Sequence, residues 1–303
     1  MTTQTAIGFI GVGAMGAPMV ERLIAKGFPV AVYDPDASAM QPLVALGARA
    51  ATSPRDAATG ADTVYTCLPS PQVSLEVALG DTGIGQDLPQ LKVYIEASTI
   101  GTSTVKQMAL GLAQRGIALL DAPVSGGPRG ARAGTLATMV AGDKAAYDIS
   151  LPIFEAIAQK IFYVGEAPGL AQMTKLANNM ISAAAMAATS EAVVLAVKAG
   201  VDPNTLIDAI NSSTGRNTFT SDKIPQSVLT RSFDYGGKFS IIYKDVRLCL
   251  DEARALEVPM WVGHSVMQLW FQGMLEGRSN DDYTTITKMI EDWSGVTVDG
   301  RKK

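Results

Sequence analysis

The stretch "GFIGVGAMGAPM", residues 8–19, decides how the first part of this chain folds. Its three glycines, Gly11, Gly13 and Gly16, match the pattern G-x-G-x-x-G and follow directly on the apolar run 5–10. The pattern alone is weak evidence, because many ordinary turns match it. Here, however, a strand is predicted before the pattern and a helix, 15–26, after it. This context indicates a turn built for backbone contact with a phosphate.

Each glycine has its own part in such a turn. Gly11 allows the tight turn, Gly13 lets the backbone approach a pyrophosphate, and Gly16 lets the helix pack close to the strand. The start of the helix adds free N–H groups and a positive dipole for the phosphates. We therefore predict that a dinucleotide cofactor is bound by the residues of this turn, which are Gly11, Val12, Gly13, Ala14, Met15 and Gly16. The alternative is a purely structural glycine turn.

Asp34 ends the next predicted strand, "PVAVYD", residues 29–34. Its carboxylate is placed to accept hydrogen bonds from the diol of an adenine ribose, and it would repel a 2′-phosphate. The residues that follow, "PDAS", contain no arginine to neutralise such a phosphate. The sequence therefore favours NAD over NADP as the cofactor.

The composition limits the class of protein. A chain of 303 residues has room for about two domains, and its net charge of −4, without a long run of one sign, predicts neither a nucleic-acid nor a membrane partner. Cys67 and Cys249 are too far apart in the chain for a disulfide framework, so we expect a cytoplasmic protein. No signal peptide is predicted, and the apolar stretch 176–197 carries polar and charged residues that favour a buried helix over a membrane span.

His264 is the single histidine of the chain. One histidine and two distant cysteines argue against a zinc site, so no metal is predicted. A Ser-His-Asp arrangement would have to use His264, which lies in "WVGHSVMQLW", a pattern typical of a packed helix. We therefore interpret it as a residue on the surface or in the core of a helix.

Residues 1 to about 163 alternate between short β-rich runs and helical segments such as 102–115. This alternation predicts an α/β domain of the Rossmann type, with a mainly parallel sheet and helices on both faces. The predicted strands are 6–10, 29–34, 62–68, 92–98, 117–124, 136–142 and 161–165.

Strand signals almost vanish after Gly165. The segment 169–200 contains no proline, is rich in Ala, Leu and Met, and ends at Gly200, which predicts one long helix. The residues after it read as further helices. We therefore predict an NAD-binding Rossmann domain over 1–163, joined by the long helix to an all-α domain for substrate binding and oligomerisation over 164–303.

A second glycine-rich segment, "DAPVSGGPRGARAGTL", occupies residues 121–136. It follows a predicted strand and presents the hydroxyl of Ser125 and the backbone N–H groups of Gly126 and Gly127 as hydrogen-bond donors. Such donors suit a carboxylate, although an ordinary loop would also explain them.

The long helix carries Lys175 and Asn179, which share one face because they are four residues apart. A lysine in so apolar a helix is costly unless it faces a polar cleft, and desolvation there would lower its pKa towards the range of proton exchange. The alternative is a surface lysine. Lys244, in "YKD", lies on another predicted helix, and for it a solvated surface charge is an equally good reading.

Four segments in the same order make the chain resemble the β-hydroxyacid dehydrogenases over about residues 5–296. These segments are "GFIGVGAMGAPM", "DAPVSGGPRGARAGTL", "GLAQMTKLANNM" and "KDVRLCLDEA". The family includes 3-hydroxyisobutyrate dehydrogenase and tartronate semialdehyde reductase. The resemblance implies an active site in the cleft between the domains and a homodimer or homotetramer. It also implies reversible oxidation of a small 3-hydroxy acid to its 3-oxo acid with a nicotinamide cofactor. Asp34 favours NAD over NADP for that cofactor.

The resemblance also assigns roles to residues. It implies that Lys175 is the catalytic lysine, that Asn179 is its partner and contacts the substrate, and that Ser125, Gly126 and Gly127 bind the substrate carboxylate. The remaining cofactor contacts that it implies are Leu68, Pro69, Thr99 and Lys244.

The sequence departs from the family at two places. Gly-x-Gly is usual before the lysine, but here Leu170 and Ala171 follow Gly169, which could shift how the helix starts. The C-terminal domain is unusually aromatic, and if Tyr243 or Trp261 lined the cleft, a bulkier substrate would fit. Two other functions stay open, an imine reductase of similar architecture and a dinucleotide-binding protein without catalysis. The sequence leaves the substrate, its chirality, the physiological direction and the subunit count undecided.

Overall fold

The computed structural model describes residues 5–85 and 87–301. The chain divides into two compact units, 1–175 and 176–303. Two apolar cores lie in the first unit and one in the second. The predicted class, a Rossmann-type α/β domain followed by a helical domain, is confirmed.

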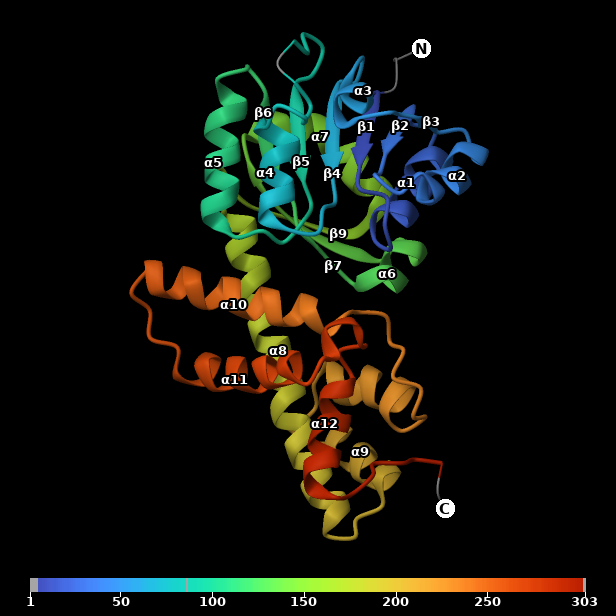
Figure 1. Cartoon of the computed structure of the whole chain (residues 1–303), viewed down its shortest axis with the longest axis vertical. Helices are drawn as coiled ribbons and strands as arrows, with labels where there is room; N and C mark the ends of the chain where they lie inside the picture. The colour runs from blue at the N-terminus through green and yellow to red at the C-terminus, as the bar shows by residue number, and fades with distance from the viewer. Residues whose placement is uncertain (1–4, 86, 302–303) are drawn as a thin grey trace. The chain divides into compact units, whose positions relative to one another are not determined.

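The first unit is built on one mainly parallel sheet (Figure 1). Its strands run in the order β3-β2-β1-β4-β5-β6-β8-β7, with β9 also paired to β8. All pairs are parallel except those of β8 with β6 and β7. The strands are β1 (Ile7–Ile10), β2 (Val30–Tyr33), β3 (Arg49–Ala50), β4 (Thr63–Thr66), β5 (Val93–Glu96), β6 (Ala118–Asp121), β7 (Val124–Ser125), β8 (Leu136–Gly142) and β9 (Ala158–Gly165).

Helices cover both faces of this sheet, because successive strand residues point to opposite sides. Phe9 of β1 belongs to a core that α1 and α7 complete, whereas its neighbour Ile10 belongs to a core that α3, α4 and α5 complete. The helices of this unit are α1 (Gly16–Ala25), α2 (Ala37–Ala45), α3 (Pro54–Ala58), α4 (Pro71–Leu79), α5 (Thr102–Ala113), α6 (Gly127–Ala133) and α7 (Lys144–Ile157).

Each predicted strand is found, with small changes at the ends. The segment 117–124 was expected to form one strand, but it forms β6 and β7, separated at Pro123. Proline has no N–H to continue the ladder, so the pairing with β8 breaks there. The two-residue edge strand β3 was not predicted.

The second unit contains helices and, in its described part, no strand. Its elements are α8 (Leu170–Lys198) from Leu176 onward, then α9 (Pro203–Asn211), the π-helix η1 (Phe219–Val228), α10 (Phe239–Ala255), α11 (Trp261–Leu275), the short 3₁₀-helix η2 (Arg278–Asn280) and α12 (Thr285–Ser294). Trp270 is fully buried at the centre of this unit and packs on Phe239 with ring centroids 4.5 Å apart.

Helix α8 has the length and apolar composition of a membrane span. Core helices of globular proteins pass the same test, and one side of α8 lies in the core of the second unit through Leu176, Ala183, Met186 and Val193. The expectation of a buried helix is therefore correct for one side only, because Ile181 and Leu195 on the same helix are exposed.

Glu96 is fully buried at the end of β5, where its Oε1 accepts a hydrogen bond of 2.8 Å from the backbone N–H of Ser98. Desolvation raises the pKa of this carboxyl to about 7, and the hydrogen bonds from Ser98 only partly oppose the shift. The folded state therefore holds this proton at pH values where the unfolded chain has lost it.

We predict that Glu96→Gln becomes more stable relative to wild type as the pH rises. A raised pKa stabilises the fold fully below pH 4.5, the ordinary pKa of a glutamate in an unfolded chain, and this contribution is lost as the pH passes about 7. We measure the free energy of unfolding in urea at pH 5 and at pH 8.5. The value for the variant minus that for wild type should increase by about 2–3 kcal/mol between the two pH values. Any effect of the amide that does not depend on pH cancels when the two pH values are compared. A stability difference that stays constant with pH would therefore contradict the prediction.

Candidate functional site

The glycine turn after β1 has a backbone that only glycine allows. Gly11 has φ +91°, and a Cβ on it would lie 2.3 Å from the carbonyl oxygen of Cys67. A Cβ on Gly16 would lie 2.0 Å from the carbonyl oxygen of Gly11. Gly13 differs, because a Cβ there would meet nothing within 4 Å and the residue is exposed. Gly11 and Gly16 therefore close the turn, while Gly13 leaves open space above its backbone.

Four segments with predicted cofactor contacts lie at one edge of the sheet. The glycine turn follows β1, Asp34 follows β2, Leu68 and Pro69 follow β4, and Thr99 follows β5. These strands are neighbours and parallel, so their carboxyl ends meet at the same edge. The chain runs from β1 to β2 and β3 on one side and returns to β4 and β5 on the other, which makes β1 and β4 the topological switch point where ligands bind in such sheets.

The carboxylate of Asp34, which was predicted to bind the adenine ribose, is hydrogen-bonded to the glycine turn. Its Oδ2 accepts a hydrogen bond of 2.9 Å from the N–H of Val12, and its Oδ1 accepts one of 3.0 Å from the N–H of Asp36. A carboxylate has about four acceptor positions, so this one can still accept from a ribose diol. The open backbone at Gly13, together with Asp34, fits the phosphates and the ribose of a dinucleotide.

The second glycine-rich segment forms the end of β7 and the start of α6. Ser125 is the last residue of β7 and is half-buried. Gly126 and Gly127 follow with φ +128° and +62°, a conformation that favours glycine, and α6 begins at Gly127. The alternative of an ordinary loop does not describe this segment, which contains a strand end and a helix. Its hydroxyl and helix-start N–H groups suit an anion.

Lys175 lies in the second turn of α8 and is buried, with 7% of its surface exposed. Gly169 has φ +101° and the helix begins at Leu170 directly after it. Ala171, which stands where a glycine is usual, is fully buried. The reading of Lys175 as an exposed surface lysine is therefore wrong.

Sequence reasoning missed three buried polar residues around the start of α8, which are Ser98, Asp121 and Gln172. Asp121 ends β6, and its Oδ2 accepts from the N–H groups of Gly169 at 3.1 Å and Gln172 at 2.9 Å. Desolvation raises the pKa of Asp121 to about 6, opposed mainly by the hydrogen bonds from Gln172. The only sequence signal for Asp121 was its place at the head of the second glycine-rich segment.

In the second unit, Asn179 and Lys244 share one buried carboxylate. The Nδ2 of Asn179 donates to Oδ2 of Asp245 at 2.6 Å, and Nζ of Lys244 lies 3.2 Å from Oδ1 of the same residue. Asp245 is 2% exposed and was also missed. Its signal was the pair "KD" at 244–245. Asp245 orients both residues that the resemblance assigned to substrate and cofactor.

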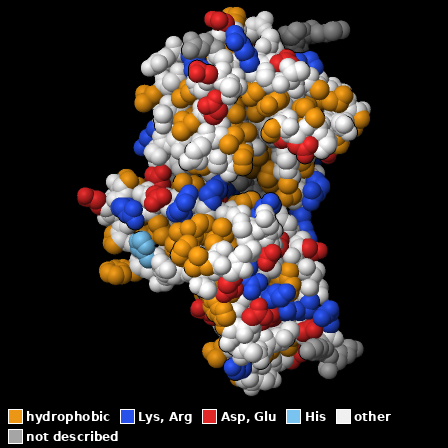
Figure 2. All heavy atoms as spheres, viewed as in Figure 1, with side chains coloured by type: hydrophobic (Ala, Val, Ile, Leu, Met, Phe, Trp, Pro, Cys, Tyr) orange, Lys and Arg blue, Asp and Glu red, His pale blue; other side chains and the backbone are white. Residues whose placement is uncertain are grey.

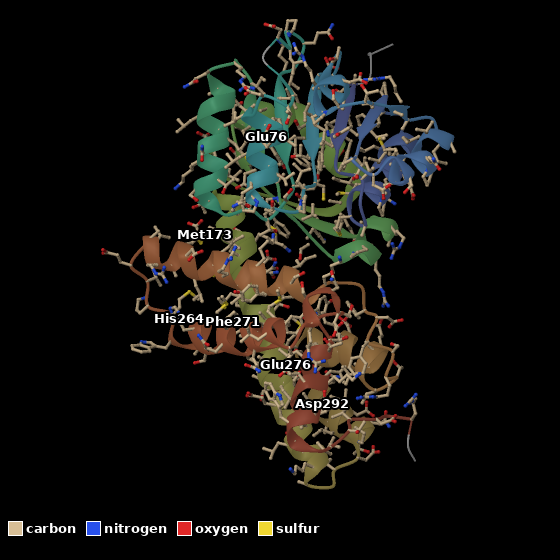
Figure 3. The ribbon with its side chains drawn as sticks, viewed as in Figure 1. Glu76, Met173, His264, Phe271, Glu276 and Asp292 are labelled. Carbon is tan, nitrogen blue, oxygen red and sulfur yellow. The ribbon has the colours of Figure 1, made fainter. Side chains whose placement is uncertain are left out.

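The remaining residues singled out in the sequence lie on α10 and α11. His264 is exposed on α11, as expected of a helix-surface histidine, and is visible as the pale blue side chain in Figure 2. Trp261 at the start of α11 is 85% exposed. Tyr243 stacks on Phe271, with ring centroids 6.0 Å apart, and His264 and Phe271 can be followed along α11 in Figure 3.

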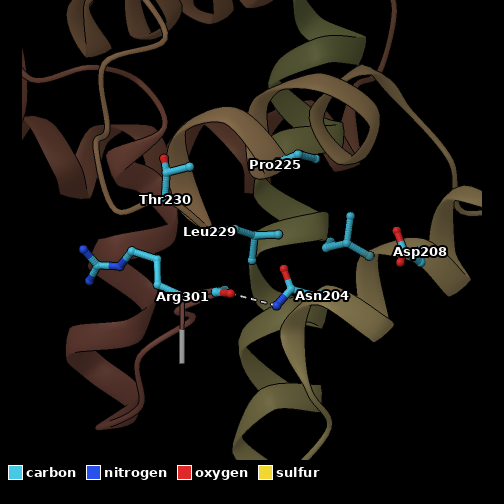
Figure 4. A pocket seen from close by; sticks show the side chains of 8 residues that line it. Asn204, Asp208, Pro225, Leu229, Thr230 and Arg301 are labelled. Carbon is cyan, nitrogen blue, oxygen red and sulfur yellow. Dashed lines mark hydrogen bonds between the residues drawn. The ribbon is translucent and has the colours of Figure 1, made fainter. Parts of the chain in front are cut away.

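Two surface pockets lie within the second unit. One, of about 300 Å³, lies between α9, η1 and the C-terminal segment, where Asn204 donates a hydrogen bond to the carbonyl oxygen of Gly300 (Figure 4). The other, of about 320 Å³, is lined by Trp261, His264 and Arg254 among others. The described residues that line these pockets include Trp261, which was considered for the substrate cleft, but none of the residues assigned to the catalytic, substrate or cofactor site.

Comparison with known families assigns both parts of the chain. Residues 6–165 match the NAD binding domain of 6-phosphogluconate dehydrogenase, and residues 169–290 match the NAD-binding domain of NADP-dependent 3-hydroxyisobutyrate dehydrogenase. A nicotinamide dinucleotide is therefore the cofactor, as the glycine turn indicated.

Individual relatives agree over nearly the whole length. The chain is 32% identical to 2-(hydroxymethyl)glutarate dehydrogenase of Eubacterium barkeri, covering 99% of each chain. It is 35% identical to the NAD-dependent L-serine dehydrogenase of Pseudomonas aeruginosa, covering 95% of this chain and 99% of the relative. The solved structure of Mycobacterium tuberculosis 3-hydroxyisobutyrate dehydrogenase with L-serine superposes with a TM-score of 0.83 at 29% identity, covering 95% and 99%. This protein is a nicotinamide-dependent oxidoreductase of hydroxy acids and belongs to the β-hydroxyacid dehydrogenase family.

Proposed function

We propose that this enzyme reversibly oxidises the hydroxyl group of a short 3-hydroxy acid to the 3-oxo acid, with NAD as cofactor and Lys175 as acid and base. One observation carries the proposal: a lysine buried in the second turn of α8, in the same unit as the glycine turn and the Ser125 segment. The substrates named for the relatives support it. L-serine, 3-hydroxyisobutyrate and 2-(hydroxymethyl)glutarate all carry a hydroxymethyl group on the carbon next to a carboxylate.

The cofactor would be held at the carboxyl edge of β1, β2, β4 and β5. The backbone between Gly11 and Gly16 and the first N–H groups of α1 would bind the pyrophosphate. Asp34 would accept from the adenine ribose. Leu68, Pro69 and Thr99 follow the strands beside the switch point, and Lys244 would contact the nicotinamide end. Bound there, the nicotinamide supplies the hydride acceptor for oxidation and the hydride donor for reduction.

The substrate carboxylate would bind at the start of α6. Ser125 offers its hydroxyl, and Gly126 and Gly127 offer backbone N–H groups without side chains that would block an anion. Asn179 would contact the substrate and position Lys175. Its own amide is held by Asp245, so its orientation is fixed before the substrate binds.

Lys175 would move the proton. Burial favours the uncharged form of an amine, which can accept the hydroxyl proton as hydride leaves the β-carbon. In the reverse direction its ammonium would donate that proton to the carbonyl oxygen. Oxidation therefore uses the neutral amine, and reduction uses the ammonium.

We predict that Lys175→Ala lowers the rate of hydride transfer by about 10²–10⁴, the usual contribution of a positioned acid or base. Single-turnover formation of NADH at several pH values measures this rate directly. Lys198→Ala is the matched control, because Lys198 lies exposed near the end of the same helix. Near-full activity of Lys175→Ala with an unchanged pH profile would refute the assignment.

We predict that Asp34→Ala reverses part of the preference for NAD. The change removes the acceptor for the ribose diol and the charge that repels a 2′-phosphate, so kcat/KM should fall about tenfold or more with NAD and rise with NADP. Asp36→Ala is the control, because Asp36 caps α2 through the N–H of Ser38 and should cost stability without changing the cofactor ratio. A ratio unchanged in Asp34→Ala would argue against this role.

A substrate screen separates the competing functions. Short 3-hydroxy acids and semialdehydes, with aromatic ones included, are tested with NAD(H) and NADP(H) beside a cyclic imine. Turnover of a 3-hydroxy acid supports the proposal, reduction of the imine alone would indicate an imine reductase, and NADH binding without turnover would indicate a protein that only binds the dinucleotide. Turnover of the aromatic acids would indicate a substrate site large enough for a bulkier substrate, as expected if Tyr243 or Trp261 lined it.

A further inference from the structure

The side-chain amide of Gln172 is fully buried, and each of its hydrogen-bonding positions is occupied. Its Oε1 accepts from the N–H groups of Ile100 at 2.8 Å and Gly101 at 3.1 Å. Its Nε2 donates to the carbonyl oxygen of Ser98 at 3.0 Å and to Oδ1 of Asp121 at 2.7 Å. An amide has two acceptor and two donor positions, so none of them is left over.

Three of these four hydrogen bonds join α8 to the loop after β5, and the fourth, to Asp121, joins it to the end of β6. Residues 98–101 lead from β5 into α5, and Gly101 stands at the start of α5 with φ +84° and no side-chain cap. The Oγ of Ser98 also accepts from the N–H of Leu68 at 2.6 Å, which ties in the loop after β4. The amide thus links α8 directly with the loop of Thr99 and, through Ser98, with the loop of Leu68, which are two of the segments predicted to contact the cofactor.

Asp121 fixes the same helix from the other side. It lies at the end of β6, and with both oxygens it accepts from the backbone N–H groups of Gly169 and Gln172 and from the side chain of Gln172. It therefore satisfies the N–H of Gln172, which is one of those at the start of α8 that no helical carbonyl can reach, and the N–H of Gly169 just before the helix. The first turn of α8 is held at a defined depth against β5 and β6.

Lys175 lies three residues after Gln172, so the two are neighbours on the helix surface. We infer that Gln172 is a positioning residue that sets the depth and rotation of Lys175 relative to the cofactor loops. This inference rests on the proposed role of Lys175. A helix transmits a displacement of its first turn to the next turn, and a misplacement of about 1 Å at a reacting group can cost about 10²-fold in rate.

The test begins with Gln172→Met, which keeps the length of the side chain and removes all four hydrogen bonds. We expect kcat at saturating substrate to fall 10- to 100-fold. Two controls accompany it. Thr174→Ala changes an exposed residue of the same turn. Leu112→Ala removes a fully buried side chain at the far end of α5, and it should lower the thermal midpoint while leaving kcat, measured well below that midpoint, within about twofold of wild type.

A double-mutant cycle with Lys175→Ala decides between positioning and a merely structural role. If Gln172 acts through the lysine, Gln172→Met should change the residual rate of Lys175→Ala less than threefold. Equal losses in both backgrounds, or an unchanged kcat with a raised KM for NAD, would overturn the inference. If Gln172→Met does not fold, Asp121→Asn interrupts the same network at similar volume, and the same coupling with Lys175 is expected.

The two proposals fail in different ways. A near-wild-type rate in Lys175→Ala alone would overturn the acid–base role and this inference with it. A large loss in Lys175→Ala, multiplied by a further large loss in the double variant, would leave the acid–base role intact and overturn only the positioning by Gln172.

Discussion

The close approach of two backbone segments, at Gly11 and Cys67, is the constraint on which the site depends. A single Cβ at Gly11 would lie 2.3 Å from the carbonyl oxygen of Cys67, so the ends of β1 and β4 can lie this close only with glycine between them. The parallel pairing of β1 with both β2 and β4 then places the Gly13 backbone, Asp34 and the loop of Leu68 at one edge of the sheet. The absence of a side chain at Gly11 therefore shapes the edge of the sheet where the dinucleotide would bind.

Around that edge, the protein uses buried polar groups where most cores use apolar ones. Glu96, Asp121 and Gln172 are fully buried, and each bonds backbone N–H groups of neighbouring loops or of α8. Such groups are unfavourable to bury unless their partners are in place, so they specify one arrangement of the loops. A single arrangement of these loops is what keeps the proton-transferring and cofactor-binding residues in fixed positions.

The sequence was informative where the signal is local. The strands, the helix after the first turn and the burial of Lys175 follow from composition and spacing within a few residues. Gln172 and Asp121 could not be found in this way, because they meet only when α8 packs on the ends of β5 and β6, more than fifty residues away in the chain. The role of Asp245, next to Lys244, was missed for the same reason, because its partner Asn179 is distant in the chain. The segment 117–124 was predicted as one strand, and the proline at 123 is the residue that could have indicated its division into β6 and β7.

The unbroken course of α8 has a consequence for how such enzymes can change. Lys175 closes the first unit and Asn179 lies in the second, yet they belong to one helix without a flexible linker. Four helical residues advance by about 6 Å, so this separation is a property of the helix itself. Inserting one residue between them would turn Asn179 by about 100° about the axis, which removes it from the lysine's side. The relative placement of Lys175 and Asn179 therefore depends on the length of this helical segment and not on the course of a loop.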